Sequence, residues 1–273
     1  MTGPTQYGII EETQEQPKFP VRTLLRVPHQ DLAEGLVVTR EAFGQNTFQG
    51  NLTEMAKNYC YPNSREVISF REPTAAESIS RACPDVKAHP ELAEFAFEKD
   101  TKPEIFDLRW LQAGYIVRTS DGVYATTKIT DEAKLKALRD KAKKVNGIWI
   151  LENGKVEGVQ DFGFAPYESF TRGVQDCDTF AEGGLARVLE HTQEKTASKL
   201  RAIASPKNYS RGVNVCYFDA TNEPALRVAY LGSDTGDVNR RLHVYGSYWS
   251  GDGGYAFGVL KASTEGAKPT QKS

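Results

Sequence analysis

A cysteine between two aspartates is the feature of this chain best suited to chemistry. Residues 167–191 read YESFTRGVQDCDTFAEGGLARVLEH, and Cys177 lies where a helix is expected to begin. A thiol becomes a strong nucleophile only as the thiolate, which helix N-terminal amides and a nearby imidazole stabilise. We expect Asp176 or Asp178 to be the N-cap, Cys177 to lie beside unpaired amides, and Asp178 to support the site. Because both carboxylates oppose thiolate formation, a histidine must come from elsewhere.

One of four histidines is expected to be the general base. They are His29, His89, His191 and His243. His191 lies about 20 Å further along the axis of the expected helix, which is too far to reach the thiol. His29 and His89 stand in proline-flanked, loop-like surroundings. His243 is in an expected strand of the sheet that this helix should cover, so we expect it to be the partner of Cys177.

Acyl transfer by such a pair needs two further groups. A third side chain must orient the imidazole. Asp252, in the turn SGDGG, is our first candidate, and Asp237 and Asn239 in the preceding loop are alternatives. An aspartate in such a turn is more often there for the turn itself. The amide of Cys177 and a nearby donor such as Gln175 would form the oxyanion hole.

The second half of the chain favours an α+β fold. Residues 114–129 form two β runs around Asp121-Gly122, which is a hairpin signal. A broken apolar stripe predicts one long helix over residues 178–204, and four β runs follow. We therefore expect an antiparallel sheet packed against a long helix beginning near Cys177, with a smaller mixed N-terminal region. The predicted parts are an N-terminal region at 1–105, an α+β domain at 106–262 and a polar tail at 263–273.

Composition excludes several classes of protein. The 273 residues carry a net charge of only -2, with 39% hydrophobic and 26% charged residues, so no global field recruits nucleic acid. No apolar run is long enough for a transmembrane span. The N-terminus lacks the features of a signal peptide, so a cytoplasmic location is expected, and a mature exported form is also compatible. The four cysteines show no CxxC spacing. We expect no metal and no cofactor, and the oligomeric state stays open.

The segment FAPYESFTRGVQDCDTFAEGGLARVLEH resembles the nucleophile segment of the transglutaminase-like, papain-related cysteine peptidase superfamily. The matching features are the lead from Pro166 to Ser169, Gly173, the run from Asp176 to Ala181 and the apolar helix after it. LHVYGSYW, which contains His243, resembles the histidine strand of that family. The resemblance covers roughly residues 160–260. The strand after the histidine departs from the pattern, since residues 255–263 carry no acid or amide.

Three interpretations remain open at this point. The resemblance implies a cysteine-dependent hydrolase or acyltransferase that acts on amide bonds of a peptide or protein through a thioester. The alternative is a non-catalytic binding or scaffold protein on the same fold. The third is an α+β domain in which Cys177 is an incidental thiol. Tyr248, Trp249 and Tyr255 would bind substrate if they line a cleft, although aromatic residues in strands are usually packing residues.

Overall fold

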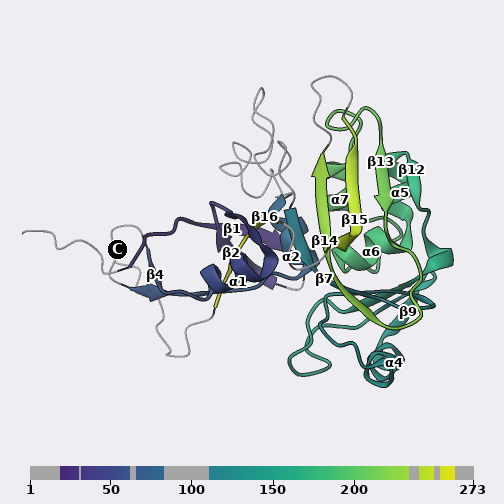
Figure 1. The fold of residues 1–273 in the computed structure, drawn as a ribbon, viewed down its shortest axis with the longest axis horizontal. Helices are drawn as coiled ribbons and strands as arrows, with labels where there is room; N and C mark the ends of the chain where they lie inside the picture. Colours follow the sequence, from purple (N-terminus) through teal and green to yellow (C-terminus); the bar gives the residue numbers. More distant parts are fainter. Residues whose placement is uncertain are drawn as a thin grey trace, which may run out of the picture.

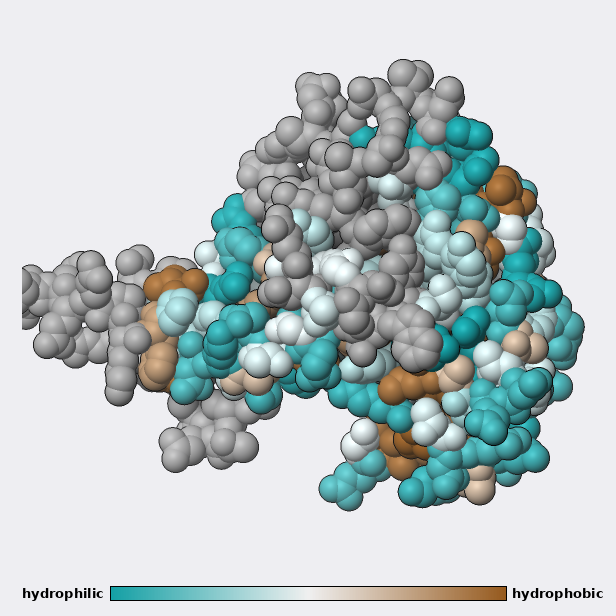
Figure 2. Space-filling view, in the orientation of Figure 1, coloured by the Kyte–Doolittle hydropathy of each residue, from teal (hydrophilic) through white to brown (hydrophobic). Residues whose placement is uncertain are grey.

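The computed structural model describes residues 19–30, 32–61, 66–82, 111–233, 240–248 and 253–261, except for the side chains of residues 45, 46 and 248 (Figure 1). These ranges form a mixed α and β protein in which antiparallel strands predominate. Within them, every helix is too short or too polar to cross a membrane. Figure 2 shows that most of the described surface in that view is hydrophilic, with small, separate hydrophobic areas.

One large sheet carries most of the structure. Its strands lie in the order β12-β13-β15-β14-β7-β8-β11-β10-β9. The neighbouring strands in this path are antiparallel, except that β13 and β15 are parallel. Their bounds are β7 Leu111–Arg118, β8 Gly122–Ala125, β9 Lys143–Val145, β10 Ile148–Ile150, β11 Gly163–Pro166, β12 Gly173–Gln175, β13 Val213–Cys216, β14 Ala225–Ser233 and β15 Leu242–Tyr248.

The N-terminal strands form smaller sheets that the end of the chain completes. A second sheet has the order β1-β2-β17-β6, and β4 pairs with β5. Strand β3 pairs with β16, which also pairs with β7 and so belongs to the large sheet. Through β16 and β17, residues beyond the predicted boundary near 105 pair with N-terminal strands. The bounds are β1 Leu24–His29, β2 Leu32–Thr39, β3 Phe43–Thr47, β4 Tyr59–Cys60, β5 Val67–Ile68, β6 Phe70–Arg71, β16 Gly253–Ala256 and β17 Val259–Leu260.

Short helices cover the large sheet. Helices α2 (Ala75–Ala82), α5 (Cys177–Glu182), α6 (Gly184–Glu190) and α7 (Ser198–Ile203) share one apolar core with the facing side chains of the sheet. Helix α4 (Glu132–Lys141) packs through Leu135 and Leu138 in a separate core with Tyr124 and Phe164. Helix α1 (Phe48–Met55) lies in a third core with Tyr230 of β14. A 3₁₀ turn, η1, spans Tyr167–Ser169.

The predicted long helix over residues 178–204 is wrong, because this segment forms three short helices. Gly183 adopts an extended conformation (φ -64°, ψ 144°) and separates α5 from α6. A Cβ on the next residue, Gly184, would collide with the Ser169 side chain, so this glycine permits close packing. His191 ends α6 in the left-handed region with φ 54°. The apolar residues of the predicted stripe do pack in one core, but they lie on three separate helices.

Candidate functional site

Cys177 occupies the first position of α5, as the sequence predicts. Asp176 is the N-cap, and its Oδ1 accepts hydrogen bonds from the Asp178 and Thr179 amides at 2.9 and 2.8 Å. The cap has therefore already satisfied the amides that would stabilise a thiolate.

The environment of Cys177 favours the neutral thiol. Its S–H contacts Asp178 Oδ1 at 3.7 Å. Burial, followed by the charge of Asp178, raises the pKa of the thiol above its ordinary value, and the opposing effect of Arg201 is weaker. A nucleophilic cysteine needs the opposite shift.

The large sheet separates Cys177 from His243. Cys177 packs against the helix-side core, which also contains Leu242 and Val244 of β15. Side chains alternate along a strand. His243, between these two residues, therefore points to the other face, where its ring stacks on Tyr245 with 5.5 Å between centroids. The structure thus does not bring the predicted nucleophile and base together.

The remaining predicted site residues are dispersed or lie outside the described ranges. Gln175 ends β12, and its side-chain amide donates to the Thr171 carbonyl, just before that strand, at 2.7 Å. Tyr255 lies on β16 and packs over Gly44 of β3. Asp252 and Trp249, the alternatives Asp237 and Asn239, and the side chain of Tyr248 lie outside the described residues.

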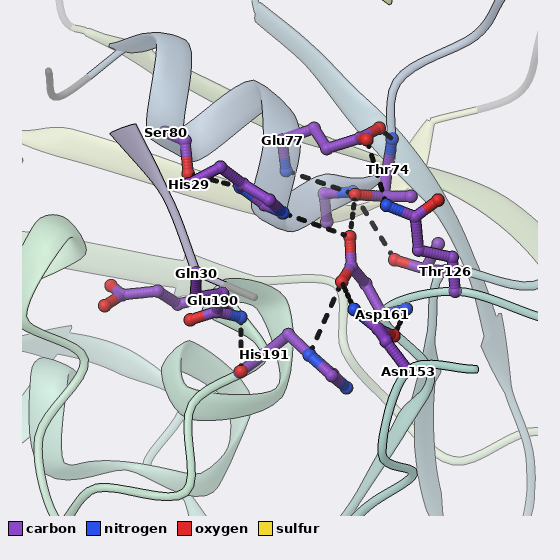
Figure 3. A network of polar contacts seen from close by, with 12 residues as sticks. His29, Gln30, Thr74, Glu77, Ser80, Thr126, Asn153, Asp161, Glu190 and His191 are labelled. Carbon is purple, nitrogen blue, oxygen red and sulfur yellow. Dashed lines mark hydrogen bonds and ion pairs between the residues drawn. The ribbon is translucent and has the colours of Figure 1, made fainter. Parts of the chain in front are cut away.

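A different group of polar residues converges in the interior, where β1, α2, α6 and the loop before β11 meet (Figure 3). Its members are His29, Thr74, Glu77, Ser80, Asp161 and His191, all at most 8% exposed. Burying this many titratable groups is costly unless each is paired or bound to an ion. We call these six residues the buried polar cluster.

Ser80 of α2 fixes the His29 ring at the end of β1. His29 Nδ1 lies 2.8 Å from Ser80 Oγ, which also accepts a hydrogen bond from Lys199 Nζ at 2.7 Å. The other ring nitrogen, Nε2, faces Asp161 Oδ2 at 3.8 Å. The ring is therefore oriented with Nε2 towards the carboxylate.

Glu77 is placed by the start of α2. The Glu77 amide donates to Thr74 Oγ1 at 3.1 Å, and the Thr74 amide donates to Glu77 Oε2 at 2.8 Å. This reciprocal pair is a capping box, with a Thr-x-x-Glu sequence signature. Arg71 then binds both carboxylate oxygens, at 2.8 and 2.6 Å. The Glu77 side chain is fully buried, and its carboxylate forms an ion pair with Arg71.

Asp161 lies in the loop before β11 with φ 51°. Asn153 holds it there through two reciprocal hydrogen bonds, from Asp161 N to Asn153 Oδ1 (2.7 Å) and from Asn153 Nδ2 to Asp161 Oδ1 (2.8 Å). Asp161 Oδ2 accepts from Thr74 Oγ1 at 2.5 Å. Asp is among the few non-glycine residues found at positive φ, and the Asp161 side chain is fully buried.

His191 lies on the other side of Asp161. Its Nδ1 lies 3.4 Å from Asp161 Oδ1, and its Nε2–H donates to the Leu151 carbonyl at 2.9 Å. Gln30, next to His29, donates to the carbonyls of His191 and, at 2.8 Å, Glu190. These contacts join the N-terminal hairpin to the end of α6.

His29, Glu77 and Asp161 each offer one ligand atom within 4.8 Å of the other two. Sequence reasoning missed this group because its members come from three distant segments with no common spacing. The only local signal was the Thr-x-x-Glu pattern, which predicts a helix start rather than a site. The proline-flanked surroundings of His29 predict a loop, but His29 ends strand β1 instead.

No known family model, curated protein or solved structure matches this chain. Its function must therefore be inferred from the arrangement of its own residues. The arrangement that converges most closely is one imidazole nitrogen facing two buried carboxylates. Such a donor set holds divalent metal ions in proteins.

Proposed function

We propose that this protein binds one divalent transition-metal ion through His29 Nε2 and one oxygen each of Glu77 and Asp161. The observation that carries the proposal is the convergence of these three ligand atoms within 4.8 Å of one another. Ligands at about 2.0–2.2 Å from a tetrahedral ion lie roughly 3.3–3.6 Å apart. The three ligand atoms therefore need to approach one another by at most about 1.5 Å.

The donor types favour Zn²⁺ or a similar first-row ion. Imidazole suits zinc and its neighbours, whereas Ca²⁺ and Mg²⁺ prefer all-oxygen sites. Both carboxylates are buried, and a dication between them would compensate their charge where solvent cannot. Among the ion pairs of the described residues, Arg71 is the arginine or lysine that pairs with one of them, at 2.6 Å from Glu77, while the contacts of Asp161 are with histidines.

The surroundings of each ligand resemble the supports that metal ligands have. A metal-bound histidine usually forms a hydrogen bond through its other ring nitrogen, which fixes its orientation. His29 has this support in Ser80 at 2.8 Å. Asp161 has it in Asn153 at 2.8 Å. These residues would position the ligands, while the ion itself would join the N-terminal hairpin to α2 and the loop before β11.

Metal content tests the proposal directly. The purified full chain is loaded with Co²⁺ or Zn²⁺, dialysed, and assayed for bound metal and, with Co²⁺, for visible absorption. We expect about one ion per chain. His29→Gln should abolish binding, and His243→Gln, which changes a buried histidine on the far face of the sheet, should retain it. If the wild-type protein carries no metal after exposure to a micromolar excess of the ion, the proposal is rejected, whether or not the variants fold.

Acyl transfer at Cys177 is a weaker proposal. It rests on the resemblance of the Cys177 segment to transglutaminase-like cysteine peptidases and on the position of the thiol at the start of α5. It requires a general base from somewhere other than the described position of His243. Among the interpretations of the sequence, the proposed metal site agrees better with a non-catalytic binding or scaffold protein than with an enzyme that uses Cys177.

A further inference from the structure

A pocket of about 360 Å³ adjoins the buried polar cluster. Residues 71–74, 126–129 and 158–160 surround it, together with Tyr115. Its volume falls in the range of roughly 300–1,000 Å³ that is usual for small-molecule sites. The larger part of its lining surface is apolar, with Pro73, Ile129 and Val159 among the apolar residues, and charged and hydroxyl groups supply the polar part.

Three residues form the wall between this pocket and the metal ligands. Arg71, Thr74 and Gln160 line the pocket. Arg71 and Gln160 donate to Glu77, the latter at 3.1 Å, and Thr74 donates to Asp161. The pocket is thus one side chain away from both carboxylates.

Two cations meet at Glu72 on the edge of the pocket. Lys128 Nζ contacts Glu72 Oε2 at 2.6 Å, and Arg71 donates to the Glu72 carbonyl at 3.0 Å. Lys128 also lies over the Tyr115 ring, 4.8 Å from its centroid. The Lys128 and Glu72 side chains are 50% and 35% exposed, so a ligand can compete for this contact.

The backbone is strained at the same place. Thr126, which lines the pocket, has φ 53°. A β-branched residue is a rare occupant of the left-handed region, and such strain gathers at ligand-binding sites. Thr126 and Thr127 thereby contribute to a polar wall close to Lys128.

We propose that this pocket binds a small molecule through a carboxylate or phosphate group held by Lys128 and Arg71, and that metal at Glu77 strengthens this binding. The second part rests on the proposed metal site. Without metal, Arg71 forms an ion pair with Glu77, in which both terminal guanidinium nitrogens donate hydrogen bonds to the carboxylate. When Glu77 gives an oxygen to a metal ion, Arg71 releases at least one of these bonds. Its planar guanidinium then suits a second carboxylate or phosphate.

The coupling must be reciprocal, because both ligands act on the same salt bridge. If metal tightens anion binding by some factor, the anion tightens metal binding by that factor. Glu72 is the internal competitor, since its carboxylate occupies Lys128. Removing its charge should therefore act in the opposite direction to removing Lys128.

Calorimetric titration of the full chain tests this proposal. Acetate and inorganic phosphate are the two anion probes, each titrated with and without one equivalent of Co²⁺. We expect Lys128→Gln to weaken binding of at least one probe by about ten-fold and Glu72→Gln to tighten it. Lys144→Gln is the matched control, because Lys144 also lies over an aromatic ring, that of Trp149 at 4.6 Å. It should bind like wild type.

The outcomes separate this proposal from the metal site. Binding of neither probe at millimolar concentration, or binding unchanged by Lys128→Gln, would overturn the anion pocket, while metal content still decides the proposed function. Anion binding that is equal with and without bound Co²⁺ would overturn the coupling alone. If the chain takes up no metal but binds a probe through Lys128, the metal site is rejected and the pocket is upheld.

Discussion

His29 at the end of β1 faces Asp161 in the loop before β11, with 3.8 Å between Nε2 and Oδ2. That separation is too long for a hydrogen bond and close to the distance between two ligands of one metal ion. The hydrogen bond between Nδ1 and Ser80 restrains the His29 ring in this position. The pair is therefore the clearest geometric reason to expect an ion between the two chain segments.

Metal should stabilise the fold. An ion that binds only the native state at 100 times its Kd adds about 2.7 kcal/mol to the free energy of unfolding. For a chain of this size that corresponds to a rise in Tm of roughly 5 °C or more. Thermal unfolding with Zn²⁺ and with excess chelator measures it. His243→Gln should keep the shift and Asp161→Asn should lose it; an equal shift in both variants would place the ion elsewhere.

Removing Arg71 should destabilise the protein strongly. Arg71→Met leaves the Glu77 carboxylate, whose side chain is 0% exposed, without its cation. Breaking a buried pair in this way typically costs about 3–5 kcal/mol. The double variant Arg71→Met with Glu77→Gln should recover part of that loss, because no uncompensated charge remains. Urea unfolding of the two single variants and the double variant measures the coupling, and additive losses would show that the pair is not coupled.

Local sequence signals predicted the local structure well. Asp121-Gly122 ends the turn between β7 and β8, where the hairpin was expected. Such a turn depends on a few adjacent residues, whose preferences a sequence shows. Asp176 likewise caps α5.

The same local signals could not predict which distant segments contact one another. Alternation placed His243 in a strand, but which face it takes depends on the packing of Leu242 and Val244 against helices elsewhere in the chain. The convergence of His29 with Asp161 depends on β1 meeting the loop before β11. No spacing within a segment encodes such a meeting.

Cys177 should react slowly at neutral pH. Burial and the nearby Asp178 raise the pKa of its thiol, so the thiolate fraction at pH 7 is below that of free cysteine. Alkylation by iodoacetamide, followed on the Cys177 peptide by mass spectrometry, should therefore be slower than for free cysteine and should rise at alkaline pH. Asp178→Asn should increase the rate at pH 7 by about two-fold or more.

Glu182→Gln is the control for that experiment, since it removes an exposed acid from the same helix. It should change the rate less than Asp178→Asn does. Rapid alkylation of wild type at pH 7 would contradict the raised pKa. It would also strengthen the proposal of acyl transfer at this residue.

The ion pair between Asp121 and Arg139 should give a pH-dependent contribution to stability. Burial raises the pKa of Asp121, but hydrogen bonds from Thr119 and Arg139 outweigh it and lower the pKa below its ordinary value. A depressed folded pKa contributes stability above the unfolded value near 3.9, and that stability is lost as the pH falls through the folded pKa. The Asp121 side chain is 54% exposed, so the contribution should be under about 1 kcal/mol.

Arg139→Gln isolates this contribution. The variant also loses contacts of the guanidinium with the Phe164 ring, 4.8 Å from its centroid, but that loss does not depend on pH. The destabilisation in urea should therefore be larger at pH 7 than at pH 2.5, because the ion pair is progressively lost as Asp121 takes up a proton. Lys136→Gln, an exposed change on α4, should show no such difference. An equal loss at both pH values would mean that Arg139 acts on stability through its ring contacts rather than through Asp121.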